Sequence, residues 1–254
     1  RGLGISNKDL SSIAVGYDPS SGQTTITPPT TTTPPVTSTT SKTIKFTWRY
    51  NNKDYDYSDV FSSDLYSYYK NLSKVLTFSS DNPPTNLRES YYNLFLSSQS
   101  SKDNSIDRIL TGLRALAQKE GFSEDQTVEF ILAFIQYIPY DYSKPQNAIV
   151  PNYPYETLYT TLGVCSDKTF LAVMFLRRLG YGAAIFDFPD IKHSVVAVAC
   201  PVDQSTYGSG YCYVETTNYF PIGVIPPTIN AGVAVSSDDQ LNLIFDTTRW
   251  GKVE

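Results

Sequence analysis

The segment that most constrains the fold is an apolar helix that begins at a cysteine. The sequence CSDKTFLAVMFLRRL, residues 165–179, predicts a helix, and Gly180 directly after it is a helix-ending signal. Every side chain from Phe170 to Leu176 is apolar, so this part of the helix has no wide polar face. A helix of that kind is buried at the centre of its domain. The remaining elements must therefore pack around it and hold Cys165 rigidly at its N-terminus.

A hairpin and three helices are predicted upstream. Two aromatic-rich runs flank Asn51-Asn52-Lys53, which favours a β-hairpin. Polar N-cap residues, apolar spacing and Gly or Pro stop signals predict helices over residues 63–76, 105–118 and 123–138. Residues 140–160 are rich in Tyr and Pro and are predicted to form an ordered loop.

Strands are predicted after the cysteine helix. The runs YGAAIFDF, HSVVAVAC and YCYVETT are β-like, are separated by loop signals, and begin at residues 181, 193 and 211. A further strand-like run, LNLIFDTT, occupies residues 241–248. Helices followed by strands in this order favour an α+β fold with a mostly antiparallel sheet.

The N-terminal region differs in composition from the rest. Residues 24–40 contain ten Thr and four Pro among 17 residues. Such a tract buries too little apolar surface to order itself, and its prolines keep it extended. We interpret it as a stalk or linker of a surface or secreted protein, with a merely disordered tail as the alternative. The predicted organisation is a disordered segment over residues 1–43 and one folded domain over residues 44–254.

Charge and composition argue against several function classes. The formal net charge of the 254 residues is −5 and there are no Lys/Arg runs, so no electrostatic footprint for nucleic acid is present. No apolar run reaches the roughly 18 residues needed to cross a bilayer. Because the sequence begins at Arg1 rather than Met, a signal or anchor segment that tethers the protein to a membrane could precede it. One histidine and the lack of CxxC or HxxxH spacing argue against a metal site, and no cofactor is expected.

Three residues form a candidate catalytic triad. Cys165 begins its helix, where unsatisfied N–H groups and the helix dipole favour a thiolate. His193, the one histidine of the chain, lies 28 residues further on and opens a predicted strand. Glu215 lies another 22 residues on, in the strand that can pair with it. An imidazole that activates the thiol and a carboxylate that orients the imidazole would make a working triad.

Four segments resemble the transglutaminase-like superfamily, which has a papain-like core with Cys, His and Asp, sometimes Glu, in that chain order. They are FIQYIPYDY, the stretch from YPYETL to AAIF, IKHSVVAVAC and YCYVETTNYFPIGVIP, within residues 134–226. The resemblance extends back to residue 44 because a group of prokaryotic, often archaeal, envelope-associated proteins carries a similar aromatic hairpin. It implies that Cys165, His193 and Glu215 occupy the triad positions. It also implies that Gln136 helps the Cys165 N–H to form an oxyanion hole.

The sequence departs from the usual family pattern at two positions. Val164 stands before the cysteine where a polar residue is common, and the acid is Glu215 rather than Asp. Close to the cysteine, we interpret Asp167 as a capping acid and Lys168 as a solvated lysine. The segment YPYETL, residues 153–158, could either line a substrate groove or pack the loop, with its glutamate bonded to backbone.

Cys200 and Cys212 flank a polar loop and could form a disulfide that bridges the hairpin in an oxidising compartment. Strand alternation places both on the face opposite to His193 and Glu215. A regular antiparallel register cannot oppose the cysteine pair and the His193–Glu215 pair directly at the same time, so a disulfide would require a bulge or an offset.

We expect a cysteine-dependent acyl-transfer enzyme that acts on amide bonds of a protein or peptide at the cell surface or outside the cell. Hydrolysis is preferred over transamidation because water is always available and no groove for an amine acceptor is readable. The alternative is a non-catalytic, surface-displayed binding or scaffolding module that keeps the fold. The sequence does not indicate the natural substrate.

Overall fold

The computed structural model describes residues 40–78, 81–145, 150–188 and 191–226. In these ranges the fold is of the α+β class, with six α-helices and two small antiparallel sheets. The Thr/Pro-rich tract lies outside the described residues except for its last threonine, and the strand predicted at 241–248 lies outside them too.

The elements follow one another in an order close to the predicted one. They are β1 (Ser41–Tyr50), β2 (Lys53–Ser62), α1 (Ser63–Asn71), α2 (Leu87–Leu96), α3 (Ser105–Glu120), α4 (Glu124–Gln136), α5 (Pro154–Thr160), α6 (Cys165–Arg178), β3 (Ala183–Phe188), β4 (His193–Ala199) and β5 (Tyr211–Val214). The hairpin and the helices α3, α4 and α6 confirm the predictions for those segments. The first helix ends at Asn71, five residues earlier than predicted.

Two helices were not predicted. α2 follows the proline-rich break, and the Asn86 side chain caps it by accepting the Glu89 N–H at 3.0 Å. α5 lies inside the segment predicted as a loop, so that prediction is wrong for residues 154–160. Pro154 occupies the first helical position of α5. Proline lacks an N–H group, but an N–H at that position would have no partner within the helix, and the fixed φ of proline suits a helix start.

The hairpin packs on α4 through aromatic side chains. Alternate residues of β1 are buried, among them Phe46 and Trp48. The Trp48 ring lies 5.2 Å from Phe130 and 5.4 Å from Phe134, centroid to centroid. Asn51 and Asn52 both have positive φ, as a two-residue hairpin turn that matches strand twist requires.

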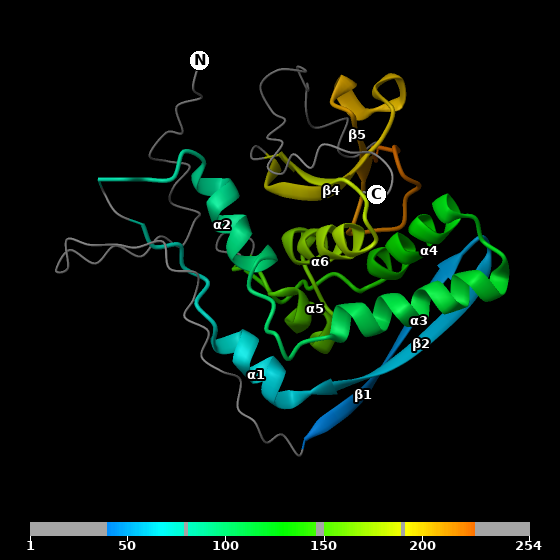
Figure 1. Ribbon diagram of the computed structural model, residues 1–254, viewed down its shortest axis with the longest axis horizontal. Helices are drawn as coiled ribbons and strands as arrows, with labels where there is room; N and C mark the ends of the chain where they lie inside the picture. The colour runs from blue at the N-terminus through cyan, green and yellow to red at the C-terminus, as the bar shows by residue number, and fades with distance from the viewer. Residues whose placement is uncertain (1–39, 79–80, 146–149, 189–190, 227–254) are drawn as a thin grey trace.

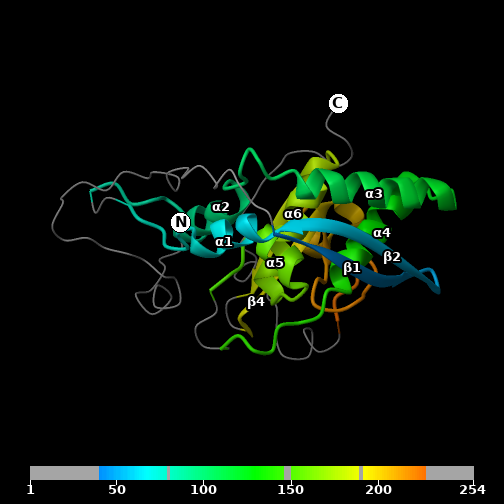
Figure 2. The ribbon, with the colours of Figure 1, turned by 90° about the horizontal axis from the view of Figure 1, so that it is seen from below.

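α6 occupies the centre of the fold, as its apolar sequence predicts. Figure 1 shows it between the sheet that contains β4 and β5 and the pair α3 and α4, and Figure 2 shows the β1–β2 ribbon along the outer side of that pair. Every residue of α6 from Cys165 to Leu176 is buried. The first residue of this helix is therefore fixed by packing on several sides.

The second sheet has the strand order β3-β4-β5, with both pairs antiparallel. One face, which includes Val196, Val198 and Val214, joins the main core around α6. The other face forms a smaller cluster with Val195 and Tyr213. Because β4 and β5 are antiparallel, the start of β4 and the end of β5 lie at the same end of the sheet, close to the start of α6.

Candidate active site

Cys165 is the first residue of α6, and its surroundings hold the helix start in place. The preceding residue, Val164, is fully buried and has no side-chain acceptor for the first N–H groups of the helix. Its own N–H donates to Asp167 Oδ2 at 3.0 Å, so the predicted capping role of Asp167 is confirmed. The N–H groups of the first turn, including that of Cys165, have no intrahelical partner.

His193 and Glu215 meet at one end of the sheet. His193 is the first residue of β4, and Glu215 directly follows β5. His193 Nε2 lies 3.2 Å from Glu215 Oε2, and the His193 ring and the Cys165 thiol are close enough to shift each other's pKa. Because Nε2 contacts the carboxylate, Nδ1 is the ring nitrogen left for the thiol. The structure thus brings together the three residues predicted as a triad.

Four further groups hold the Glu215 carboxylate. Oε2 accepts the Tyr213 hydroxyl at 2.7 Å, and Oε1 accepts the Thr217 hydroxyl at 2.6 Å. Oε1 also accepts the N–H groups of Thr216 and Thr217 at 3.0 and 2.8 Å. All these donors favour the ionised form, and they fix the orientation in which the carboxylate faces His193.

Burial and charge act in opposite directions on each member of the triad. Burial opposes ionisation of Glu215. Its hydrogen bond with His193, the charge of His193 and the donors of Thr217 outweigh burial and lower the Glu215 pKa to about 2. Burial lowers the pKa of His193, but its bonds to Cys165 and Glu215 raise that pKa to about 9. Burial raises the pKa of the Cys165 thiol. The interactions with His193, which include its charge, and those with Ser194 outweigh burial and bring the thiol pKa below its ordinary value. These directions favour a thiolate–imidazolium pair at neutral pH.

Thr169, one turn after Cys165 on α6, ties the helix to both strands. Its hydroxyl donates to the carbonyl of Ser194 at 3.0 Å and lies 3.4 Å from the hydroxyl of Thr216. Ser194 follows His193, and Thr216 follows Glu215. One side chain of the cysteine helix is therefore in contact with the neighbours of both the base and the acid.

The register of β4 and β5 explains how the disulfide and the His193–Glu215 contact coexist. Val198 is opposite Cys212, so Cys200 lies two residues beyond the position that faces Cys212. The disulfide Cys200–Cys212 nevertheless forms, diagonally, with a Cα–Cα distance of 5.6 Å. His193 and Glu215 are also offset, in the opposite sense. The register therefore lies midway between the two pairs, and each pair is offset from it by two residues, as the sequence predicted.

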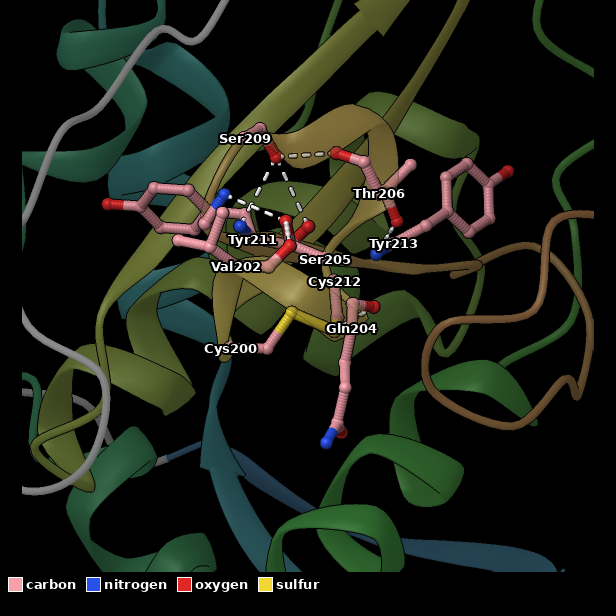
Figure 3. The surroundings of a disulfide bond; sticks show 10 residues. Cys200, Val202, Gln204, Ser205, Thr206, Ser209, Tyr211, Cys212 and Tyr213 are labelled. Atoms are coloured by element: carbon pink, nitrogen blue, oxygen red, sulfur yellow. Dashed lines mark hydrogen bonds between the residues drawn. A yellow bond between two sulfur atoms is a disulfide. The ribbon is translucent and has the colours of Figure 1, made fainter.

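The disulfide closes the loop between the strands (Figure 3). Figure 3 shows the two sulfur atoms below a compact loop in which Ser209 is bonded to Thr206 and Tyr211. Thr206 Oγ1 in turn accepts the Tyr213 N–H at 2.9 Å. Cys200 and Cys212 belong to the main core, whereas Val195 and Tyr213, each two residues from His193 or Glu215 and on the same face, lie in the smaller cluster, as strand alternation predicts.

The oxyanion role predicted for Gln136 does not agree with the geometry. Its side-chain Nε2 donates to the carbonyls of Glu215 and Phe220, each at 2.8 Å. A primary amide has two N–H groups, so both are occupied and neither is left for a developing oxyanion. Gln136 instead joins the end of α4 to the segment that carries Glu215.

The prediction of a solvated lysine at position 168 is wrong. Lys168 has no exposed surface, and its Nζ donates to the carbonyls of Gln136 at 2.9 Å and Ile138 at 2.7 Å. Burial lowers the pKa of this ammonium to about 7, and the negative charge of Glu215 opposes that shift. The apolar side chains around most of α6 were the signal that its first turn would be enclosed too.

Asp167, next to Lys168, anchors the loop before α5. Its carboxylate is fully buried and contacts Lys144 Nζ and the Asn152 N–H, at 2.7 and 2.6 Å. Lys144 also donates to the Val150 carbonyl at 3.1 Å and the Asn152 side chain at 3.0 Å. Burial raises the pKa of Asp167, against the attraction of Lys144.

The segment YPYETL packs the interior, which decides between its two predicted roles. Tyr153 and Tyr155 are buried, and their rings lie 5.7 and 5.3 Å from that of Tyr69. Glu156 accepts the Tyr153 N–H at 2.9 Å and pairs with Lys74 at 2.7 Å. These side chains therefore belong to the core.

Comparison with known proteins agrees with this geometry at the level of the domain. Residues 111–207 match the family model of the transglutaminase-like domain. This range contains Cys165 and His193 and ends before Glu215. Searches of the curated proteins and of the solved structures found no match. In the described ranges, no helix has both the length and the apolar character needed to cross a membrane.

Proposed function

We propose that the protein is a cysteine-dependent enzyme that cleaves or exchanges amide bonds through Cys165, His193 and Glu215. The observation that carries this proposal is one imidazole that lies 3.2 Å from a buried carboxylate and that shares its electrostatic environment with a thiol. A binding module would have no need for a carboxylate held by four donors behind a histidine. The match to the transglutaminase-like domain supports the same chemistry.

In the first step, the Cys165 thiolate attacks the carbonyl carbon of the substrate. The carbonyl electron pair moves to oxygen, and the N–H groups of the first turn of α6 are suited to stabilise that oxyanion. The tetrahedral intermediate collapses when the carbon–nitrogen bond breaks, and the His193 Nδ1–H gives its proton to the departing amine. A thioester on Cys165 and a neutral imidazole result.

In the second step, neutral His193 takes a proton from water, and the resulting hydroxide oxygen attacks the thioester. A carboxylic acid leaves and the thiolate–imidazolium pair is restored. An amine in place of water would give a new amide, which is transamidation. Hydrolysis remains our preference because water needs no acceptor site. Glu215 stays ionised throughout and stabilises the imidazolium.

The substrate we propose is a protein or peptide outside the cell or in the cell envelope. The disulfide Cys200–Cys212 supports an oxidising compartment, because disulfides are rare where thiols are kept reduced. The Thr/Pro-rich sequence supports display at a surface.

The rate of Cys165 alkylation by iodoacetamide, measured from pH 4 to 10, tests the proposal. Cys165 is the single free cysteine of the described residues, so labelling reports on one site. We expect a midpoint well below the roughly 8.5 of a free thiol, and its return towards that value in His193→Gln. Cys165→Ser should abolish labelling. A wild-type thiol that is inert up to pH 8 would refute the enzyme and favour the surface-displayed binding module.

A further inference from the structure

The enclosed Lys168 ammonium has no part in the proposed reaction. Its two acceptors, the carbonyls of Gln136 and Ile138, lie at the C-terminal end of α4. Carbonyls at such an end have no partner within their own helix, and the helix dipole places negative charge there. Lys168 therefore fixes the end of α4 against the first turn of α6.

Gln136 extends this contact to the acid of the triad. Its main-chain carbonyl binds Lys168, while its side-chain amide donates to the main-chain carbonyls of Glu215 and Phe220. A continuous set of hydrogen bonds thus runs from α6, through the end of α4, to the residue that orients His193. Each bond in it is 2.8 or 2.9 Å long.

We infer that Lys168 is a positioning residue that sets the place of Glu215 relative to Cys165 by holding Gln136. This inference rests on the proposed function. Lys168 lies three residues after Cys165, so both project from the same side of α6. Thr169 links α6 to the neighbours of both the base and the acid, and Lys168, at the adjacent position, adds a second link to the acid through Gln136.

A purely space-filling role would not require an ammonium at this place. Enclosing a charged group is unfavourable unless it is paired and hydrogen-bonded, and an apolar side chain of similar volume avoids that cost. Glu215 is the charged group that acts on Lys168 among the described residues, and the carboxylate of neighbouring Asp167 is bonded to Lys144 instead. The lysine is thus placed where its donors hold Gln136, whose side chain contacts the main chain of Glu215.

Two substitutions test the inference. Lys168→Met removes the donors from α6 at similar volume, and Gln136→Met removes both amide donors but keeps the main-chain carbonyl that Lys168 binds. Lys74→Met is the matched control, because it breaks another lysine contact, between the half-buried Lys74 and the buried Glu156 at 2.7 Å, that involves no triad residue. Each folded variant is titrated by Cys165 alkylation against pH, and the His193 pKa is followed by NMR.

We expect the alkylation midpoint to rise in Lys168→Met and in Gln136→Met, with at least about a threefold loss of rate at pH 7, and to stay unchanged in Lys74→Met. A wild-type midpoint kept by both test variants would overturn the inference while leaving the proposed function intact. Should Lys168→Met not fold, Gln136→Met alone decides, since an unchanged midpoint there also overturns it. An unactivated thiol in the wild type would instead refute the proposed function.

Discussion

His193 Nε2 lies 3.2 Å from Glu215 Oε2, although the two residues are not opposite each other in the β4–β5 register. The contact is possible because His193 opens its strand and Glu215 follows the end of the next one. Both side chains therefore lie at the same end of the sheet, next to the thiol at the start of α6. The position of this pair at strand ends is the basis of the predictions that follow.

Replacing Glu215 with Gln should lower the pKa of His193 from about 9 towards 6.5, because the ring loses its charged partner. The Cys165 pKa should rise, and alkylation at neutral pH should slow by about tenfold or more. The chain has one histidine, so its imidazole NMR signals need no further assignment. Glu129→Gln, which alters a carboxylate bonded to Tyr50, is the matched control. An unchanged His193 pKa in Glu215→Gln would contradict this prediction.

The same carboxylate should make stability depend on pH in the acid range. Its pKa is about 2 in the folded chain, compared with an ordinary value of 4.5. Its ionisation therefore stabilises the fold fully above about pH 4.5, and this contribution is lost as the pH falls through 2, by about 3 kcal/mol in all. Urea unfolding at several pH values compares the wild type with Glu215→Gln. The difference in unfolding free energy should shrink with acidification, and a constant difference would count against the assignment.

Removing the disulfide should destabilise the chain without abolishing the triad contact. The bond joins residues 12 apart, so the double variant Cys200→Ser/Cys212→Ser should lose about 3 kcal/mol of unfolding free energy. A thiol titration in denaturant should find one free thiol without reductant and three with it. Reductant should lower the melting temperature of the wild type and leave the double variant unaffected. Three thiols without reductant would show that the bond does not form.

Thr169→Val removes a hydroxyl from a buried contact at nearly constant volume. The Ser194 carbonyl loses its donor, so we expect a loss of about 1–3 kcal/mol in unfolding free energy and a slower alkylation of Cys165. Thr111→Val is the matched control, because that hydroxyl bonds the Asp107 carbonyl on an exposed face of α3. The control should change stability by under about 0.5 kcal/mol. Equal effects of the two substitutions would argue against a special role for Thr169.

Most of the elements could be predicted from local signals. The Asn51-Asn52 turn, the Ser123 capping box and the Gly121 helix end each act within a few residues, and the structure contains all three. The helices α2 and α5 also have local signals, Asn86 and Pro154, but both follow proline-rich stretches that favoured a loop.

The partners of buried polar groups could not be predicted in the same way. Lys168 and Gln136 bond to residues between 30 and 84 positions away, and such pairings depend on how the elements pack. The sequence indicated that α6 is enclosed but not which carbonyls its lysine would reach. Tyr213 and Thr217 went unnoticed for the same reason, since their roles depend on where the carboxylate between them points.

The identity of residue 164 decides whether its side chain can bind the first N–H groups of α6. A serine or aspartate at that position would place its own oxygen on the first N–H groups of α6, as capping residues do. In the proposed mechanism, such an oxygen would compete with an incoming carbonyl oxygen for the N–H groups of the second or third helical residue. Valine cannot do so, and Asp167 accepts the Val164 N–H at 3.0 Å, which helps to keep the helix start ordered. At position 164, the proposed mechanism therefore leaves the N–H groups of the helix start to the substrate, and the order of that helix start depends on Asp167 instead.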